Sequence, residues 1–179
     1  MIGLGLQIVK SGLFPPFSES MTLSIHADAF RNACTQFATG VAIATVLAPD
    51  GSPHGLTVSS FTSVSLSPPL LLICVDRECG IWPRFRDAPF FALNVLSEAQ
   101  RNLSVIFSVQ PEGRFDGVSW HPGTDGAPLI HDALAQFECR TERIVEAGDH
   151  AIVIGEAQRV ASNPGQPLLY FNRGYRSLA

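Results

Sequence analysis

The sequence predicts a mainly β protein whose strands form an antiparallel barrel, with two or three helices beside it. Three observations support this prediction: about seven strand patterns, turn signals of hairpin length, and strands that mostly follow strands rather than helices. A closed barrel is the economical arrangement because it removes the exposed edges of such a sheet. The 179 residues, 46% of them apolar and 16% charged, fit one domain with a substantial core.

The first half of the chain predicts one helix followed by strands. Residues 26–37 place four apolar side chains on one face of a short helix: Phe30, Ala33, Cys34 and Phe37. The apolar run 40–47 predicts a buried strand, and PDGSP at 49–53 predicts a hairpin turn after it. Residues 54–70 are interpreted as a strand, a loop and the start of the next strand, and residues 70–75 as a central strand.

A second helix is predicted over residues 97–109, directly after another central strand at 90–96. Ser97 is a candidate N-cap for this helix. The apolar residues of the helix fall on one face: Leu103, Ile106 and Phe107. A loop rich in Gly, Pro and His is expected at 111–132.

Three strands are predicted after that loop. Residues 134–147 alternate as a half-exposed strand does, with one face formed by Phe137, Cys139, Thr141 and Arg143. Residues 150–160 predict a long strand, and residues 167–171 a short last one. No repeat or second domain boundary is visible, so we expect one folded domain over 25–179 and an N-terminal extension over 1–24.

Charge and cysteine content exclude several classes of protein. The formal charge is −4 and no basic run occurs, which argues against a nucleic-acid partner. No apolar run approaches the ~20 residues that a membrane-spanning helix needs. The four cysteines form no CxxC and have no His at metal-ligand spacing. Three of them lie in apolar patterns and are interpreted as core residues: Cys34, Cys74 and Cys139. We therefore expect a reduced, cytoplasmic protein without a metal.

The stretch HGLTVSSFTSVSLSPPL, residues 54–70, holds five serines, two threonines and no charged side chain. The first interpretation is a barrel strand whose hydroxyl groups lie on the solvent-exposed face. A nucleophilic serine is disfavoured because there is no GxSxG elbow. The third interpretation is a wall for a flat heteroaromatic ring and an anion, because small residues let the backbone approach a ring and hydroxyls reach a phosphate. Composition leaves the first and third interpretations open.

Six ordered motifs resemble the flavin reductase family with the FMN-binding split barrel. The resemblance covers the chain from about Phe30 to Leu178. The motifs are FRNACTQFATGVAIAT (30–45), GLTVSSFTSVSLSPPLLLICVDR (55–77), FALNVLSEAQ (91–100), RFDGVSWHPGTDGAPLI (114–130), GDHAIVIGEA (148–157) and PLLYFNRGYRSL (167–178). The resemblance implies a homodimeric antiparallel split barrel that reduces FMN or FAD with NADH or NADPH. It also implies that the reduced flavin is delivered to a partner monooxygenase.

The resemblance also implies where the flavin binds. Four residues match the segment along the edge of the flavin ring: Thr57, Val58, Ser59 and Ser60. Three more run on toward the ribityl chain and phosphate: Ser63, Val64 and Ser65. On the next strand, Asn94 and Val95 match positions that touch the flavin, although a buried Asn is satisfied equally well by backbone.

Phosphate contacts are implied for residues 76–82, DRECGIW, where Arg77 is the natural charge partner. Here the chain departs from the family pattern, because Gly80 and Ile81 stand where many members have Ser and Thr, and Glu78 adds a negative charge. Backbone N–H groups at 79–82 are an alternative source of phosphate contacts. The choice between FMN and FAD stays open.

His150 matches a histidine near the nicotinamide and the flavin face, and is the implied catalytic residue. Arg173 and Tyr175 match a C-terminal stretch that closes over the site, often from a neighbouring subunit. Because the cofactors carry the hydride chemistry, the absence of a GxGxxG motif is no objection. The alternatives are a flavin-binding sensor or storage protein without turnover, and a split-barrel oxidase related to pyridoxine phosphate oxidases.

Overall fold

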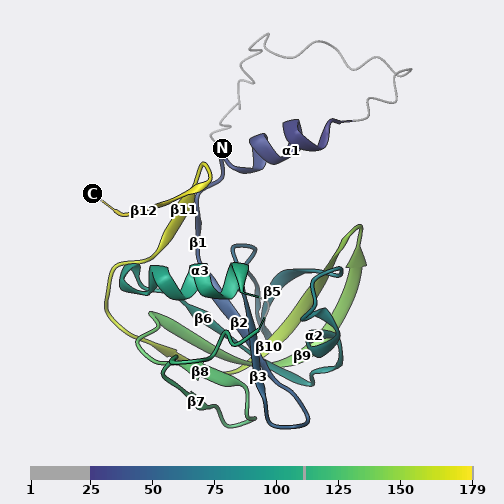
Figure 1. Ribbon diagram of the computed structural model, residues 1–179. Coiled ribbons are helices and arrows are strands. Elements are labelled where there is room, and N and C mark those ends of the chain that lie inside the picture. Colours follow the sequence, from purple (N-terminus) through teal and green to yellow (C-terminus); the bar gives the residue numbers. More distant parts are fainter. Residues whose placement is uncertain (1–24, 111, 179) are drawn as a thin grey trace, which may run out of the picture.

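A seven-stranded antiparallel sheet forms the body of the protein (Figure 1). The computed structural model describes residues 25–110 and 112–178. The strands of this sheet follow the spatial order β3-β2-β6-β9-β10-β5-β4. Their bounds are β2 (Ala42–Leu47), β3 (Pro53–Val58), β4 (Thr62–Leu66), β5 (Pro69–Asp76), β6 (Phe90–Val95), β9 (Ala135–Ala147) and β10 (His150–Ser162). The predicted mainly β, antiparallel class is confirmed.

Two small sheets and three helices complete the described fold. The small sheets pair β1 (Thr39–Gly40), β11 (Leu169–Phe171) and β12 (Gly174–Arg176), and β7 (Trp120–Pro122) with β8 (Pro128–Ile130). The helices are α1 (Ala27–Cys34), α2 (Trp82–Asp87) and α3 (Arg101–Val109). The predicted Ser97 cap is confirmed, since Ser97 and Gln100 form a capping box at the 3-10 turn before α3. No described helix is long and apolar enough to cross a membrane.

The core has two parts because successive residues of a strand point to opposite faces of the sheet. Ala44, Ile73, Phe91 and Val153 belong to the cluster inside the barrel. On the other face, β2 contributes Ile43 to a cluster beneath α3 and the C-terminal strands, which also contains Leu96, Phe107, Ile130 and Leu168. The predicted apolar face of the second helix is confirmed, since Leu103 and Ile106 pack against this cluster together with buried Phe107.

Along one seam of the barrel, a side chain and not strand pairing bridges the two ends of the sheet. The ladder of the large sheet begins at β3 and ends at β4, so no strand pairing joins these two ends. Ser60, just after β3, spans the gap to β5. Its Oγ accepts a hydrogen bond from the Cys74 N–H at 2.9 Å and donates one to the Cys74 carbonyl at 3.2 Å. The expected barrel is therefore split between β3 and the β4–β5 hairpin.

The predicted face of the strand at 134–147 is correct for its first half only. A β-bulge shifts the register between Thr141, opposite Gly155, and Arg143, opposite Ile154. Each shift by one residue reverses which side chains face inward. Beyond the bulge Ile144 packs on the core and Arg143 is exposed, so the prediction that places Arg143 with Phe137 is wrong.

The first helix is confirmed, but its apolar face covers no core. Every residue of α1 is exposed, and Phe37 beyond it is 77% exposed. The helix lies beside the C-terminal strands rather than on the large sheet (Figure 1), where the Asn172 N–H donates to the Thr35 carbonyl. Cys34 is therefore exposed, contrary to its predicted core position, and of the three cysteines predicted there only Cys139 is fully buried. The extension over 1–24 lies outside the described residues.

Candidate flavin site

The hydroxyl-rich stretch divides into hydroxyls that hold the fold and hydroxyls that face solvent. Thr57 Oγ1 donates to the Ser104 carbonyl of α3 at 2.7 Å, and Ser60 is engaged at the barrel seam. Ser59 and Ser63 are exposed, and their hydroxyls bond none of the residues that the structure describes. Ser65 Oγ accepts from the Ser67 N–H at 3.2 Å. Of the predicted ring and phosphate contacts, Ser59 and Ser63 thus present the accessible hydroxyls.

Val58 and Val95 lie in one row across the sheet. Ala42 of β2 stands between them, opposite Val58 on one side and Val95 on the other. Both valine side chains pack with the cluster inside the barrel. Any contact that these two positions make with a bound flavin therefore involves their backbone. Val64 of β4 instead exposes its side chain to solvent.

The Asn94 side chain is fully buried and satisfied by protein groups. Its Nδ2 donates to the Ile43 carbonyl at 3.2 Å and lies 3.3 Å from the Pro128 carbonyl, while its Oδ1 accepts from the Ile130 N–H at 2.8 Å. These bonds fasten β8 to the large sheet. Protein groups thus satisfy the Asn94 amide, as the backbone alternative expects, and a contact of Asn94 with the flavin stays a prediction.

Arg77 is engaged by the turn between β9 and β10. Its Nη1 lies 3.3 Å from Glu146 Oε2 and 3.4 Å from the Gly148 carbonyl. The backbone N–H groups of Cys79 and Trp82 also donate within the segment, to the carbonyls of Asp76 and Cys79. Of the backbone N–H groups at 79–82 that are expected to bind a phosphate, only those of Gly80 and Ile81 donate to no residue of the described ranges.

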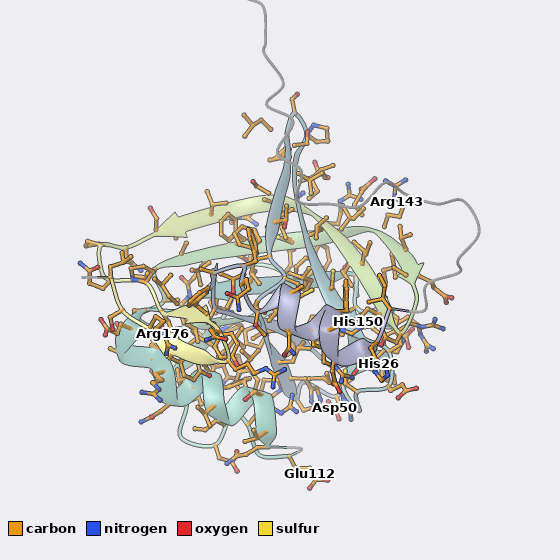
Figure 2. All side chains as sticks on the ribbon, turned by 90° about the horizontal axis from the view of Figure 1, so that it is seen from above. His26, Asp50, Glu112, Arg143, His150 and Arg176 are labelled. Atoms are coloured by element: carbon orange, nitrogen blue, oxygen red, sulfur yellow. The ribbon has the colours of Figure 1, made fainter. Side chains whose placement is uncertain are left out.

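His150 begins β10 directly opposite Asp76, so strand pairing brings it beside the 76–82 segment. The side chain of His150, which is labelled in Figure 2, is 45% exposed, and its Nδ1 lies 2.7 Å from Asp149 Oδ1. This hydrogen bond lowers the pKa of the Asp149 carboxyl. An anionic Asp149 favours a proton on Nδ1, and Nε2 has no hydrogen-bond partner among the described residues.

The C-terminal hairpin connects to the hydroxyl-rich strand through Ser104. The Tyr175 hydroxyl lies 2.8 Å from Ser104 Oγ, and the Ser104 carbonyl accepts from Thr57. The Arg101 guanidinium stacks 5.0 Å from the centre of the Tyr175 ring. The resemblance did not point to Ser104, although a serine on the apolar side of a helix is a signal because it needs a partner when buried. Arg173 instead donates to Asn32 Oδ1 on α1.

Two arginines and a histidine gather next to Gly80, and sequence reasoning missed them. Arg84 Nε donates to His54 Nε2 at 2.9 Å, and Arg84 Nη1 lies 3.4 Å from the Gly80 carbonyl. Arg114 Nη1 donates to the Gly55 carbonyl at 2.6 Å. Burial, and then the neighbouring Arg84 charge, lowers the pKa of His54. We call Arg84, Arg114 and His54 the arginine cluster.

Comparison with known proteins decides the family. The model of the flavin reductase like domain matches residues 34–179. The chain belongs to this family. Its fold is the one that the solved flavin reductases share, with a TM-score of 0.80 to the NADH:FAD oxidoreductase SgcE6 of Streptomyces globisporus, bound to NAD and FAD fragments. That structure is 38% identical in sequence, and the alignment covers 85% of this chain and 92% of the other.

Curated relatives of this flavin reductase family member are also named as flavin reductases or as reductase components. The FMN reductase (NADH) SmoA of Agrobacterium fabrum is 44% identical over 79% of this chain and 80% of its own length. A Rhizobium meliloti relative, also named for flavin reduction, is 44% identical over 82% of this chain, which spans only 47% of that relative's length. Two others are named as the reductase component or subunit of flavin-dependent monooxygenases.

Proposed function

We propose that this flavin reductase family member uses NADH to reduce FMN or FAD and supplies the reduced flavin to a partner monooxygenase. The observation that carries the proposal is the 44% identity to an NADH-dependent FMN reductase over most of both chains. A relative bound to NAD and FAD fragments supports the same pair of ligands. The names of the monooxygenase reductase components support the partner.

The proposed ring site follows the backbone of residues 57–60, with the exposed hydroxyls of Ser59 and Ser63 beside it. Flavin and nicotinamide supply the hydride chemistry when bound, so the protein has to hold the two rings together and exclude other geometries. The side chain of His150, fixed through Nδ1 by Asp149, offers Nε2 to the nicotinamide side. Tyr175 positions α3, and through Ser104 it supports Thr57.

A homodimer is part of the proposal, and exposed apolar surface supports it. The β4–β5 hairpin projects from the body of the protein (Figure 2), and residues 55–75 contain no charged side chain. Leu66 on this hairpin is 95% exposed, and Phe37 beside α1 is 77% exposed. An uncharged, apolar edge strand of this kind pairs readily with another chain. Sedimentation velocity of the purified protein measures the expected dimer.

The function is tested by adding FMN or FAD with NADH or NADPH and following the absorbance of the reduced nicotinamide. Flavin-dependent oxidation of NADH is the expected result. Flavin binding without oxidation of either nucleotide would instead favour a sensor or storage protein. If pyridoxine phosphate were oxidised and flavin were only a bound cofactor, the related oxidase would be the correct class.

Replacing His150 with Ala is expected to slow NADH-dependent flavin reduction by about tenfold or more, while flavin affinity stays within about twofold. The reason is that the imidazole faces the hydride donor rather than the flavin ring. Stopped-flow reduction and fluorescence titration with FMN measure the two effects separately. Asp149→Asn is the companion variant, with a smaller effect expected because it only loosens the ring orientation. Loss of flavin affinity with unchanged reduction would give His150 a structural role.

Replacing Ser59 with Leu is expected to weaken flavin binding by about tenfold or more, because a bulky side chain would fill the space where the ring approaches the backbone. Stability should change little, since Ser59 is exposed. Fluorescence titration with FMN measures the affinity. Thr62→Leu, at another exposed position close along the chain, is the matched control. Equal affinity of both variants and wild type would remove Ser59 from the site.

A further inference from the structure

The arginine cluster lies against the segment in which the flavin phosphate is expected. Arg84 reaches the Gly80 carbonyl from α2, and Arg114 reaches the edge strand β3 from the loop after α3. Arg84 Nε donates to His54, and Arg114 Nη1 donates to the carbonyl of the next residue, Gly55. The two cations therefore meet at neighbouring residues of β3 from two different elements of the fold.

The two guanidinium groups carry charge that the protein does not neutralise. No carboxylate of the described ranges lies within 4.0 Å of either Arg84 or Arg114. Arg114 is half-buried, and this burial lowers the pKa of its guanidinium. Burying a cation without a counter-charge is costly. An anion of the ligand would therefore offset the charge of the half-buried Arg114, and the exposed Arg84 is accessible to the same anion.

Arg77, the other cation of this region, is directed elsewhere. Its guanidinium lies 3.3 Å from Glu146 and contacts the turn between β9 and β10. A carboxylate at that distance offsets the charge that a phosphate would need. Arg77 is thus a poorer phosphate partner than either member of the cluster.

His54 fixes the orientation of Arg84. The Arg84 Nε–H can only donate, so His54 Nε2 accepts and carries no proton in this arrangement. One edge of the guanidinium is thereby held by His54, and the Nη groups remain for other acceptors. Asp50 lies in the same neighbourhood, but its Oδ1 accepts from the Ser52 hydroxyl at 2.6 Å and the Ser52 N–H at 2.9 Å.

We propose that Arg84 and Arg114 form the phosphate-binding site of this reductase, that His54 positions Arg84, and that Arg77 takes no part. This inference rests on the proposed function. The phosphate belongs either to the flavin or to the nicotinamide dinucleotide, since both offer an ester phosphate that guanidinium groups bind by charge-assisted hydrogen bonds.

The test compares ligands with and without phosphate in the full-length protein. The variants are Arg84→Gln and Arg114→Gln, with Arg86→Gln on the same helix and Arg77→Gln as controls. Arg86 is exposed and paired with Asp87. If the phosphate is that of the flavin, both cluster variants should bind FMN about tenfold or more weakly, with riboflavin affinity unchanged. The two controls should bind FMN as wild type does.

If the phosphate is that of the dinucleotide, FMN affinity stays unchanged and the KM for NADH rises about tenfold in both cluster variants. The rate with 1-benzyl-1,4-dihydronicotinamide, a hydride donor without phosphate, then stays the same. The proposal is overturned if the cluster variants match Arg86→Gln both in FMN affinity and in the KM for NADH. It is also overturned if only Arg77→Gln loses affinity for the ligand that carries the phosphate. Weakening of riboflavin and FMN alike also overturns it.

Two measurements keep the outcome separate from folding and from the proposed function. Arg114→Gln also removes the hydrogen bond to the Gly55 carbonyl and could therefore unfold the protein. In that case Arg114→Lys, which keeps the charge, serves as a folding control, and Arg84→Gln alone tests the site. Flavin-dependent NADH oxidation in wild type, together with unaffected cluster variants, refutes the site and leaves the function standing. Suppose instead that the wild type binds FMN more tightly than riboflavin but oxidises no NADH. This result refutes the proposed function, while the phosphate site is still tested by the FMN affinities of the variants.

Discussion

Asn94→Ala is expected to lower the free energy of unfolding by about 3 kcal/mol or more. The substitution removes an amide that is fully buried and bonded to several backbone groups of β2 and β8. A buried group left without a partner costs roughly 1–3 kcal/mol, and the Ile130 N–H loses its acceptor, while the Pro128 carbonyl keeps the Thr45 hydroxyl as a donor at 2.6 Å. Urea unfolding followed by circular dichroism measures the change.

The same variant separates a structural from a ligand-binding role of Asn94. Flavin affinity of the folded fraction, at a temperature well below the transition, should stay within about twofold of wild type. Gln136→Ala is a partial control, since Gln136 donates to the Ile130 carbonyl at 2.8 Å and to Asn94 more weakly. A stable Asn94→Ala protein that has lost flavin binding would return Asn94 to the cofactor site.

Gly155→Ala is expected to destabilise the fold by about 3 kcal/mol, at the upper end of overpacking effects. A Cβ at this position would stand 2.5 Å from Phe91 Cζ and 2.9 Å from Cys139 Cβ. Phe91 and Cys139 are themselves buried on neighbouring strands, so neither can move aside cheaply. The thermal midpoint should fall clearly relative to wild type in a calorimetric scan.

Gly40→Ala is the matched control, because a Cβ there meets no atom within 4 Å. It should leave the midpoint nearly unchanged. Phe91→Leu in the Gly155→Ala background should recover part of the loss by vacating the space that the new methyl group needs. A Gly155→Ala protein as stable as Gly40→Ala would show that the strands at this point separate more easily than their packing indicates.

The sequence predicts six of the seven strands of the large sheet, because buried strands are apolar runs with turn signals between them, but β4 (Thr62–Leu66) falls in the part of residues 54–70 interpreted as a loop. β7 and β8 escape prediction because Trp120–Pro122 and Pro128–Ile130 are too short for a period to show. The bulge on β9 also escapes, since one extra residue leaves no mark on the alternation until the pairing partner is known. The apolar face of α1 correctly predicts a helix, but amphipathicity does not say what covers the face.

The candidate site is less predictable, because motifs give positions along the chain and not directions of side chains. Thr57 and Val58 are neighbours in the hydroxyl-rich motif, yet one bonds α3 and the other lies in the barrel interior. Arg77 matches the phosphate segment but turns to Glu146. Arg84 and Arg114 are 30 residues apart along the chain and meet only through the fold. Their separation explains why no local pattern identifies them.

The pairing of β5 with β10 has a consequence for synthesis of the protein on the ribosome. Residues 70–76 pair with residues 150–156, so the β4–β5 hairpin emerges long before its main partner has been translated. During that interval the apolar side chains of β5 have no sheet to join, and an exposed apolar strand is prone to association with other chains. The hydroxyls of Thr62, Ser63 and Ser65 on β4 give the hairpin one edge that water solvates well before β10 has been translated. We therefore expect the hydroxyls of this stretch to keep the nascent hairpin from associating with other chains.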